Sequence, residues 1–147
     1  MNRSPMTAGQ RRCTAATARP ETEYIVHEQP DWITLLLTAI DRRDWPVFAA
    51  HLADDVEFRY GGFPAAHGRA EVLAAAAAAL APFTTVRHEL REVWSGPGSW
   101  AMEGSVTYGQ TDGGSITLPF VNVFRMAGSR IREYHIHIDP TPLRPAA

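Results

Sequence analysis

The chain has 147 residues, 45% hydrophobic and 20% charged, a composition typical of one globular domain with its own core. A net charge of −2 gives no basic excess for nucleic acid, and no apolar run approaches the roughly 18 residues of a membrane-spanning helix. The single cysteine, Cys13, excludes an internal disulfide and fits a reducing cytoplasm.

Residues 1–29 differ in composition from the rest of the chain. Four arginines lie there among serine, threonine, alanine and glycine, with little hydrophobic periodicity. A transit peptide is one interpretation, but Glu21 and Glu23 follow closely and there is no apolar signal core. We therefore expect a disordered tail over residues 1–29, or a start codon chosen upstream of Met6, and a single domain over residues 30–147.

Three helices are predicted in the first half of the domain. An aspartate after a proline is a helix N-cap signal, and Asp31 begins an apolar stripe at helical spacing that ends near Arg43. Asp44 is expected to cap a second, shorter helix that ends near residues 53–55. An alanine-rich stretch predicts the third helix over residues 69–80.

Alternation of apolar and polar residues predicts the strands. One half-buried strand, residues 56–60, lies between the second and third helices. Four further runs, separated by turn residues, predict a meander of three antiparallel hairpins: residues 86–94, 100–108, 118–126 and 134–138. This order predicts an α+β fold, in which three helices pack on one face of a curved antiparallel sheet and a ligand pocket lies between the two.

Single polar side chains are predicted on the inner, apolar face of this sheet. Asn122 must find a partner there, because a buried amide without one costs roughly 1–3 kcal/mol. Asn122 is expected either to donate to a ligand carbonyl or to bond internally to Tyr134 or Tyr60. The inner tyrosines are expected either to line a pocket or to pack with their hydroxyls bonded to each other. The expected ligand-binding residues are Tyr60, Trp100, Tyr108, Phe120, Asn122 and Tyr134.

Histidine titrates near neutral pH, so the histidines are the candidates for a general base. The alternation puts His88 on the same face as Trp94, toward the pocket, whereas His67 is expected to act in local capping and His51 to be structural. A tyrosine with an ordinary pKa of about 10 is better suited to donate a proton than to abstract one. The expected catalytic residues are His88, Asn122 and Tyr60.

His135 and His137 share one face of the last strand with Glu133 and Asp139, which resembles a metal-binding pattern. Residues two apart on a strand are separated by roughly 7 Å, however, which strains joint coordination of one ion. Their apolar neighbour Ile136 must also face the core, so the histidines are expected on a polar outer face or at a dimer interface. There is no phosphate-binding loop or zinc-type spacing, and no metal or other cofactor is expected.

The side of the sheet on which Glu103 lies depends on the register of one hairpin. A three-residue loop over residues 112–114 puts Gly104 opposite Asn122 and turns Glu103 outward, whereas a two-residue loop brings Glu103 into the pocket opposite Asn122. The apolar alternation of the strand favours the outward position.

The stretch Leu-Ala-Asp-Asp-Val at residues 52–56, the His-Gly-Arg that opens the third helix at residues 67–69, and Asp139-Pro140 after the last strand carry a resemblance. Over residues 31–143 the chain resembles the SnoaL-like branch of the nuclear transport factor 2-like superfamily. This resemblance implies a cone-shaped fold that hosts isomerases, cyclases, dehydratases, epoxide hydrolases and non-catalytic binding domains.

The same resemblance implies which catalytic groups are missing. The tyrosine, base and second acid of ketosteroid isomerases correspond to Leu36, Tyr60 and Asn122, and of these only Asn122 keeps a hydrogen-bond donor of the needed kind. The acid that limonene epoxide hydrolases and SnoaL-type cyclases place on the last strand corresponds to Ile136. The resemblance therefore favours the fold and disfavours these three chemistries.

Two functional hypotheses follow. The first is a SnoaL-like domain that encloses a small apolar or aromatic molecule, with any activity being cofactor-independent isomerisation, cyclisation or dehydration of a carbonyl compound. The second is a non-catalytic ligand-binding or dimerisation module, favoured by the absence of acids at Tyr60 and Ile136. A homodimer through the outer face of the sheet fits both, because Val121 and Val123 need cover.

Overall fold

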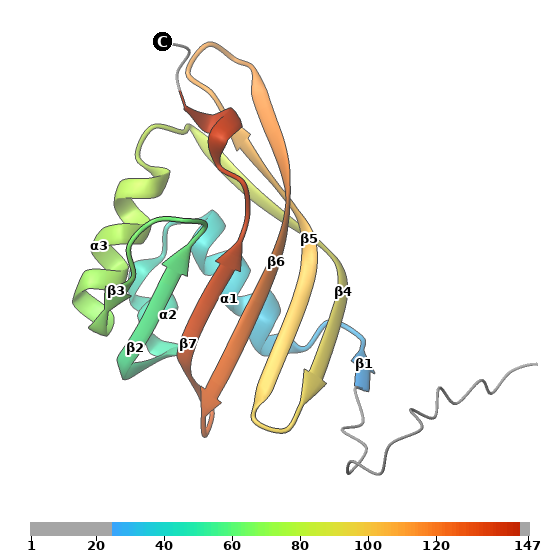
Figure 1. The fold of residues 1–147 in the computed structure, drawn as a ribbon. Coiled ribbons are helices and arrows are strands. Elements are labelled where there is room, and N and C mark those ends of the chain that lie inside the picture. Colours follow the sequence, from blue (N-terminus) through green and yellow to red (C-terminus); the bar gives the residue numbers. More distant parts are fainter. Residues whose placement is uncertain (1–24, 145–147) are drawn as a thin grey trace, which may run out of the picture.

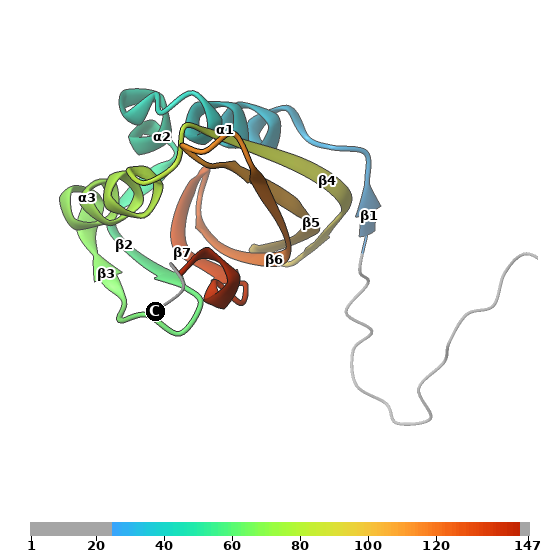
Figure 2. The ribbon, with the colours of Figure 1, turned by 90° about the horizontal axis from the view of Figure 1, so that it is seen from above.

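The computed structural model describes residues 25–144, in which three helices pack against the concave side of a strongly curved sheet (Figures 1 and 2). The helices are α1 (Asp31–Asp41), α2 (Trp45–Ala50) and α3 (Gly68–Leu80), followed near the end by the 3-10 turn η1 (Thr141–Leu143). The strands are β1 (Ile25–His27), β2 (Leu52–Tyr60), β3 (Ala66–His67), β4 (Thr85–Gly96), β5 (Ser99–Gly109), β6 (Ser115–Ala127) and β7 (Arg130–His137). The predicted α+β class is confirmed.

The strands form one sheet in the order β1-β4-β5-β6-β7-β2-β3. Strands β4 to β7 are the predicted meander of three hairpins, whereas β2 joins β7 in parallel. Strand β1 pairs with the end of β4 and lies in the region expected to be a tail. The sequence missed β1 and β3 because two or three residues are too few to show an alternating pattern. The remainder of the expected tail, residues 1–24, lies outside the described residues.

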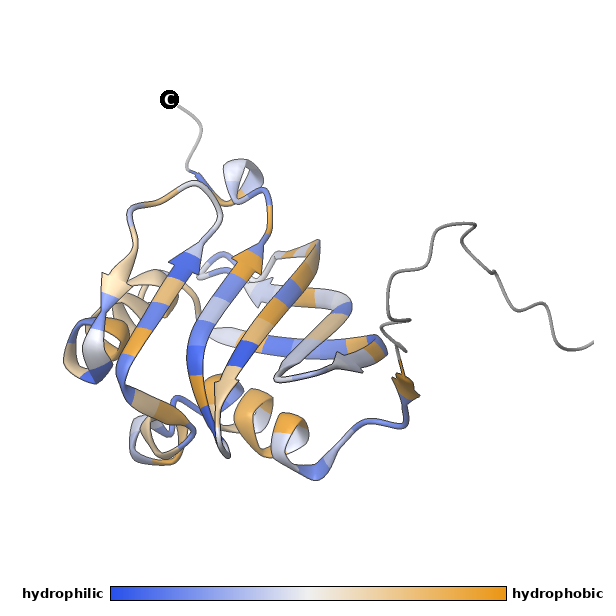
Figure 3. Cartoon of the chain, turned by 60° about the horizontal axis from the view of Figure 1, so that its bottom comes forward, coloured by the Kyte–Doolittle hydropathy of each residue, from blue (hydrophilic) through white to orange (hydrophobic). Residues whose placement is uncertain are grey.

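Hydrophobic and hydrophilic residues alternate along the strands, so that one face of the sheet is apolar (Figure 3). The β5–β6 pairing sets Met102 opposite Asn122, because the hairpin closes at Gly109 and Ser115. The expected pairing of Gly104 with Asn122 is therefore wrong by two residues. A shift of two keeps every side chain on its face, and the outward position of Glu103 is confirmed.

A β-bulge between Leu90 and Glu92 changes the inward face of β4. Before the bulge Val86 and His88 lie on the inner side, whereas after it Val93 is the buried residue. Trp94, which strict alternation placed inward with His88, instead pairs with Ala101 on the opposite face. The inward face predicted for β4 is therefore correct before the bulge and wrong after it.

The helices begin and end close to their signals. Asp44 caps α2 by accepting a hydrogen bond from the Val47 amide at 3.4 Å, but Asp31 lies in the first turn of α1 with Pro30 at the N-cap. Helix α2 ends at Ala50 rather than near residues 53–55, because the next residues already belong to β2. No helix within residues 25–144 has both the length and the apolarity to cross a membrane.

We predict that Gly104→Ala destabilises the fold by at least about 2 kcal/mol, the scale of an overpacked core. A Cβ atom there would overlap the carbonyl oxygen of Glu89, which is backbone and cannot rotate away. Gly62→Ala is the matched control, since a Cβ at Gly62 meets nothing within 4 Å. Urea unfolding of both variants measures the difference, and equal midpoints would contradict the close approach of β4 to β5.

Candidate functional site

A cavity of about 460 Å³ lies between α3, the end of β2 and η1, and is called the Tyr60 cavity below. Its walls are formed largely by alanine, proline, phenylalanine and leucine side chains. Tyr60 and Arg144 are the polar side chains among its lining residues. Ligand pockets of this size typically combine apolar walls with a few polar groups that orient the ligand.

Tyr60 is the predicted site residue that borders this cavity. Its hydroxyl lies 3.1 Å from the hydroxyl of Tyr108, its ring stacks on Phe63, and Tyr108 packs against Phe83. Burial raises the pKa of both tyrosines, so both hydroxyls are neutral at physiological pH. Each hydroxyl carries one proton, and only one of the two protons is used in the hydrogen bond between them. The proton of the other hydroxyl can be donated to an oxygen atom of a ligand.

Arg43 fixes the wall of the cavity nearest Phe83. Its guanidinium donates to the carbonyl oxygens of Leu80, at 3.0 Å, and Phe83, at 2.5 Å, and so satisfies the end of α3. Its backbone takes a φ of 55°, which is unusual for a residue with a side chain. The connection from α1 to α2 thereby ties the end of α3 to the rest of the domain.

His88 contacts Asp41, a residue that no sequence pattern indicated. The Nδ1 atom of His88 lies 2.5 Å from Oδ1 of Asp41, at the end of α1, and the His88 amide donates to the other carboxylate oxygen at 3.0 Å. Both side chains are largely buried, and the imidazole packs edge-on against Phe120. The two residues are 47 positions apart, and no local pattern links them.

Asn122 and Tyr134 lie inside the cone, as predicted. Asn122 is 1% exposed, and its Oδ1 atom has no hydrogen-bond partner among the described residues. Tyr134 is fully enclosed by aromatic rings, including Phe58 and Phe124. Burial, together with the nearby charge of Asp41, raises the Tyr134 pKa. Neither residue is part of the Tyr60 cavity lining.

Trp100 and Phe120 also lie apart from the Tyr60 cavity. Trp100 packs against Trp32 of α1 and His27 of β1, in an aromatic cluster at the other end of the sheet. Phe120 is 4% exposed and contacts the His88 ring. Alternation predicted correctly that these residues face inward, but it carries no information on their height along the cone.

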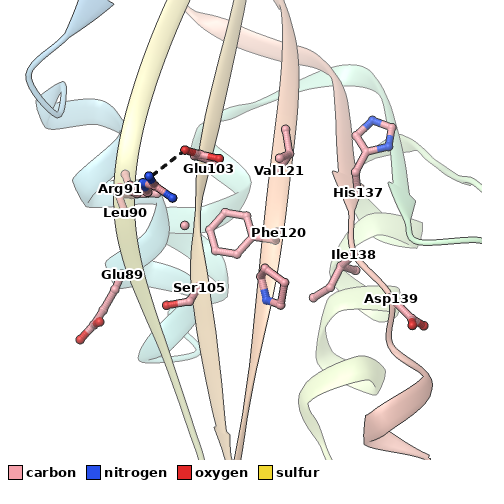
Figure 4. Close-up of a pocket in the computed structure, with 12 residues that line it drawn as sticks. Glu89, Leu90, Arg91, Glu103, Ser105, Phe120, Val121, His137, Ile138 and Asp139 are labelled. Atoms are coloured by element: carbon pink, nitrogen blue, oxygen red, sulfur yellow. Dashed lines mark ion pairs between the residues drawn. The ribbon is translucent and has the colours of Figure 1, made fainter.

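A second hollow, of about 790 Å³, lies on the outer face of the sheet and is called the outer groove (Figure 4). Glu103 is one of its lining residues and forms an ion pair with Arg91 at 3.6 Å. Val121 and His137 line the same groove. Glu103 is therefore separated by the sheet from the inner polar groups, and it does not supply a carboxylate to them.

The remaining histidines have local contacts. His135 Nε2 lies 3.5 Å from the Glu57 carboxylate on the outer face, and His51 Nδ1 bonds the Val47 carbonyl. His67 precedes α3, and its amide donates to a glutamate of the first turn. Within residues 25–144 no group of three or more histidine, cysteine, aspartate or glutamate side chains is arranged to hold a metal ion.

Comparison with known proteins identifies the family. The family model for the SnoaL-like domain matches residues 33–134. The chain belongs to the SnoaL-like family. It has the fold of the nuclear transport factor 2-like superfamily, and no curated protein matches it significantly.

Solved structures share this fold at low identity. A nuclear transport factor 2-like protein of unknown function from Burkholderia pseudomallei is 24% identical, with a TM-score of 0.67 over 76% of this chain and 91% of that one. A proposed polyketide cyclase from Xanthomonas campestris is 22% identical, with a TM-score of 0.62 over 76% and 90%. An LEH-like epoxide hydrolase from Mycobacterium tuberculosis is 14% identical, with a TM-score of 0.65 over 75% and 81%.

We predict that the free energy of unfolding falls as the pH rises above about 10. The pKa values of Tyr60 and Tyr108 are raised in the folded state, so the unfolded chain loses these protons first. Their contribution is complete below the unfolded pKa and is lost as pH rises through the folded values. The chain contains no lysine to titrate in this range.

The measurement is urea unfolding at a series of values from about pH 8 to about pH 11. The variant Tyr60→Phe/Tyr108→Phe should show a shallower decline than the unmodified chain, because phenylalanine carries no titratable proton. Identical slopes for the two proteins would show that these hydroxyls are not protected by burial.

Proposed function

We propose that this SnoaL-like domain binds a small, largely apolar carbonyl compound in the Tyr60 cavity. The observation that carries the proposal is a largely apolar cavity of about 460 Å³ with a neutral tyrosine, Tyr60, among its lining residues. An apolar wall favours a hydrophobic ligand body, and a buried hydroxyl donor favours a ligand oxygen that accepts its proton.

The proposed activity is cofactor-independent isomerisation, cyclisation or dehydration of that compound. Tyr60 would donate to the carbonyl oxygen in the cavity. His88 and Asn122 lie outside the cavity lining, so the ligand would extend past it into the cone, where His88 would move a proton and Asn122 would complete the polar contacts. The unpartnered Oδ1 of Asn122 supports this last role, because buried amides are normally satisfied. The proposed cyclase and the LEH-like hydrolase among the structural relatives support small-molecule chemistry on this fold.

Binding is tested with α-tetralone, a small apolar ketone, and with tetralin, the matched hydrocarbon without the carbonyl. NMR titration should show perturbation at Tyr60 and at the alanine methyl groups of α3. Tyr60→Phe should weaken tetralone binding by about 2- to 12-fold, the worth of one hydrogen bond, and leave tetralin unchanged.

Ala79→Leu fills the cavity and should weaken binding of both compounds, whereas Ala74→Leu is the control. Ala74 is an exposed residue of the same helix and does not line the cavity. Both substitutions add the same atoms to one helix, so a difference between them reports the cavity alone. Equal effects of the two, or perturbations confined to other parts of the domain, would contradict the proposed site.

The second candidate function, a dimerisation module, is favoured by the outer groove. Val121 lies on this otherwise charged face with 38% of its surface exposed, next to Pro119 in the lining. Charged residues of this face form ion pairs within the chain, such as Arg91 with Glu103. The apolar strip formed by Val121 and Pro119 is therefore left for a second copy of the chain to cover. A homodimer through this face is compatible with ligand binding in the Tyr60 cavity, which opens elsewhere.

We expect the chain to run as a dimer in light scattering coupled to gel filtration, and Val121→Arg to convert it to a monomer by placing a charge in the apolar strip. Leu35→Arg is the control, because Leu35 is 57% exposed but lies on α1. A monomer of the unmodified chain at high micromolar concentration would remove the dimer, and loss of the dimer in both variants would place its interface elsewhere.

A further inference from the structure

We propose that Asp41 and His88 form an acid–base dyad, with His88 Nε2 as the proton-transferring atom and Asp41 as its positioning residue. This inference rests on the proposed small-molecule function and adds the group that moves the proton. It depends on three observations: the contacts of the carboxylate, the enclosure of the imidazole, and the position of both beside the tyrosine pair.

The carboxylate fixes the imidazole in one orientation. One oxygen of Asp41 contacts Nδ1 at 2.5 Å, and the other accepts the backbone amide of the same histidine at 3.0 Å. An ionised carboxylate only accepts hydrogen bonds, so Nδ1 carries the proton in the neutral ring. The lone pair is then on Nε2, which has no hydrogen-bond partner among the described residues. The pair therefore holds His88 in the tautomer that a general base requires.

The imidazole lies on the inner side of the sheet and is largely enclosed. His88 comes before the bulge of β4, and the Phe120 ring packs edge-on against it, with the ring centres 5.6 Å apart. Its side chain is only 12% exposed. Asp41 also borders a hollow of about 670 Å³ between α1 and β4, so the carboxylate side of the pair reaches solvent.

The dyad and the tyrosine pair are neighbours on the same face. Val86 pairs with Tyr108, and His88 follows Val86 by two residues, so His88 and Tyr108 are diagonal neighbours about 7–8 Å apart at their backbones. Tyr108 in turn bonds Tyr60, which lines the cavity. A proton acceptor and a hydroxyl donor thus lie on one continuous inner surface.

The substrate class is a carbonyl compound with a C–H bond next to the carbonyl. Nε2 takes the proton from carbon, and the electron pair of the broken C–H bond forms an enolate whose oxygen accepts a hydrogen bond from a tyrosine hydroxyl. The imidazolium then returns the proton to another carbon or to the oxygen. The atoms and electrons balance without an oxidant, a reductant or a metal.

The probe reaction is base-catalysed opening of 5-nitrobenzisoxazole, a small aromatic compound. The base removes the ring proton from carbon, the C–H electron pair completes a nitrile, and the N–O bond breaks so that its electron pair stays on the oxygen of a coloured phenolate. The full chain should open this probe faster than free imidazole at the same concentration, and His88→Gln should lower the rate about 100-fold. His135→Gln is the matched control, because His135 also lies beside a carboxylate but on the outer face.

Asp41→Asn tests positioning separately from folding. Long-range proton–nitrogen NMR correlations should show His88 protonated on Nδ1 in the unmodified chain, and a shift toward Nε2 in the variant together with a lower rate. A purely structural clamp would lower the melting temperature without this coupled change. Near-UV circular dichroism checks that both variants fold. If a variant does not fold, the dyad is still tested by the reaction rate and the His88 tautomer of the unmodified chain.

The outcomes separate the two proposals. A rate no higher than that of free imidazole, or equal rates for the unmodified chain and a folded His88→Gln variant, would overturn the dyad while tetralone binding still supports the cavity. A rate that depends on His88 without any tetralone binding would support the dyad and overturn the Tyr60 cavity as the binding site. Protonation of His88 on Nε2 in the unmodified chain would also overturn the dyad.

Discussion

The β-bulge in β4 decides which side chains of that strand enter the cone. Side chains alternate with period two, so a regular strand that turned His88 inward would turn Val93 outward. The extra residue lets both face the interior. Gly104 lies under the same bend, where a side chain would collide with the backbone of Glu89. The burial of Val93 on the same face as His88 depends on this one irregularity.

The polar groups inside the cone differ in how well they are satisfied. Tyr60 and Tyr108 bond each other, and both oxygens of Asp41 are used by His88. Asn122 is less well satisfied, because its buried Oδ1 atom has no partner within residues 25–144. Leaving such an acceptor unmet costs roughly 1–3 kcal/mol. A buried acceptor of this kind is normally completed by water or by a ligand.

The sequence predicted the faces of the strands better than the positions along them. Alternation in β5 and β6 identified Tyr108 and Asn122 as inward residues, because regular strands repeat with period two. Alternation could not show that Trp100 lies in an aromatic cluster while Tyr60 borders a cavity. The position of a residue along the cone axis is set by the pairing register of the strands and by the curvature of the sheet, and alternation reports neither. The sequence did not indicate Asp41, because Asp41 meets His88 through tertiary contact alone. The alanine-rich stretch was predicted as a helix but not as the wall of a cavity.

The location of carboxylates bears on which base this domain can use. The positions that the family resemblance matches to the acids of isomerases and cyclases hold Tyr60 and Ile136, and Glu103 is turned outward toward Arg91. Asp41 is a carboxylate that does contact an inner-face side chain, and its partner is His88. The proposed base on β4 and the proposed hydroxyl donor on β2 come from distant strands of the sheet. The sheet curls far enough for the β2 hydroxyl to meet that of β5 at 3.1 Å. The curvature that closes the core thus also brings together groups that no stretch of the sequence contains.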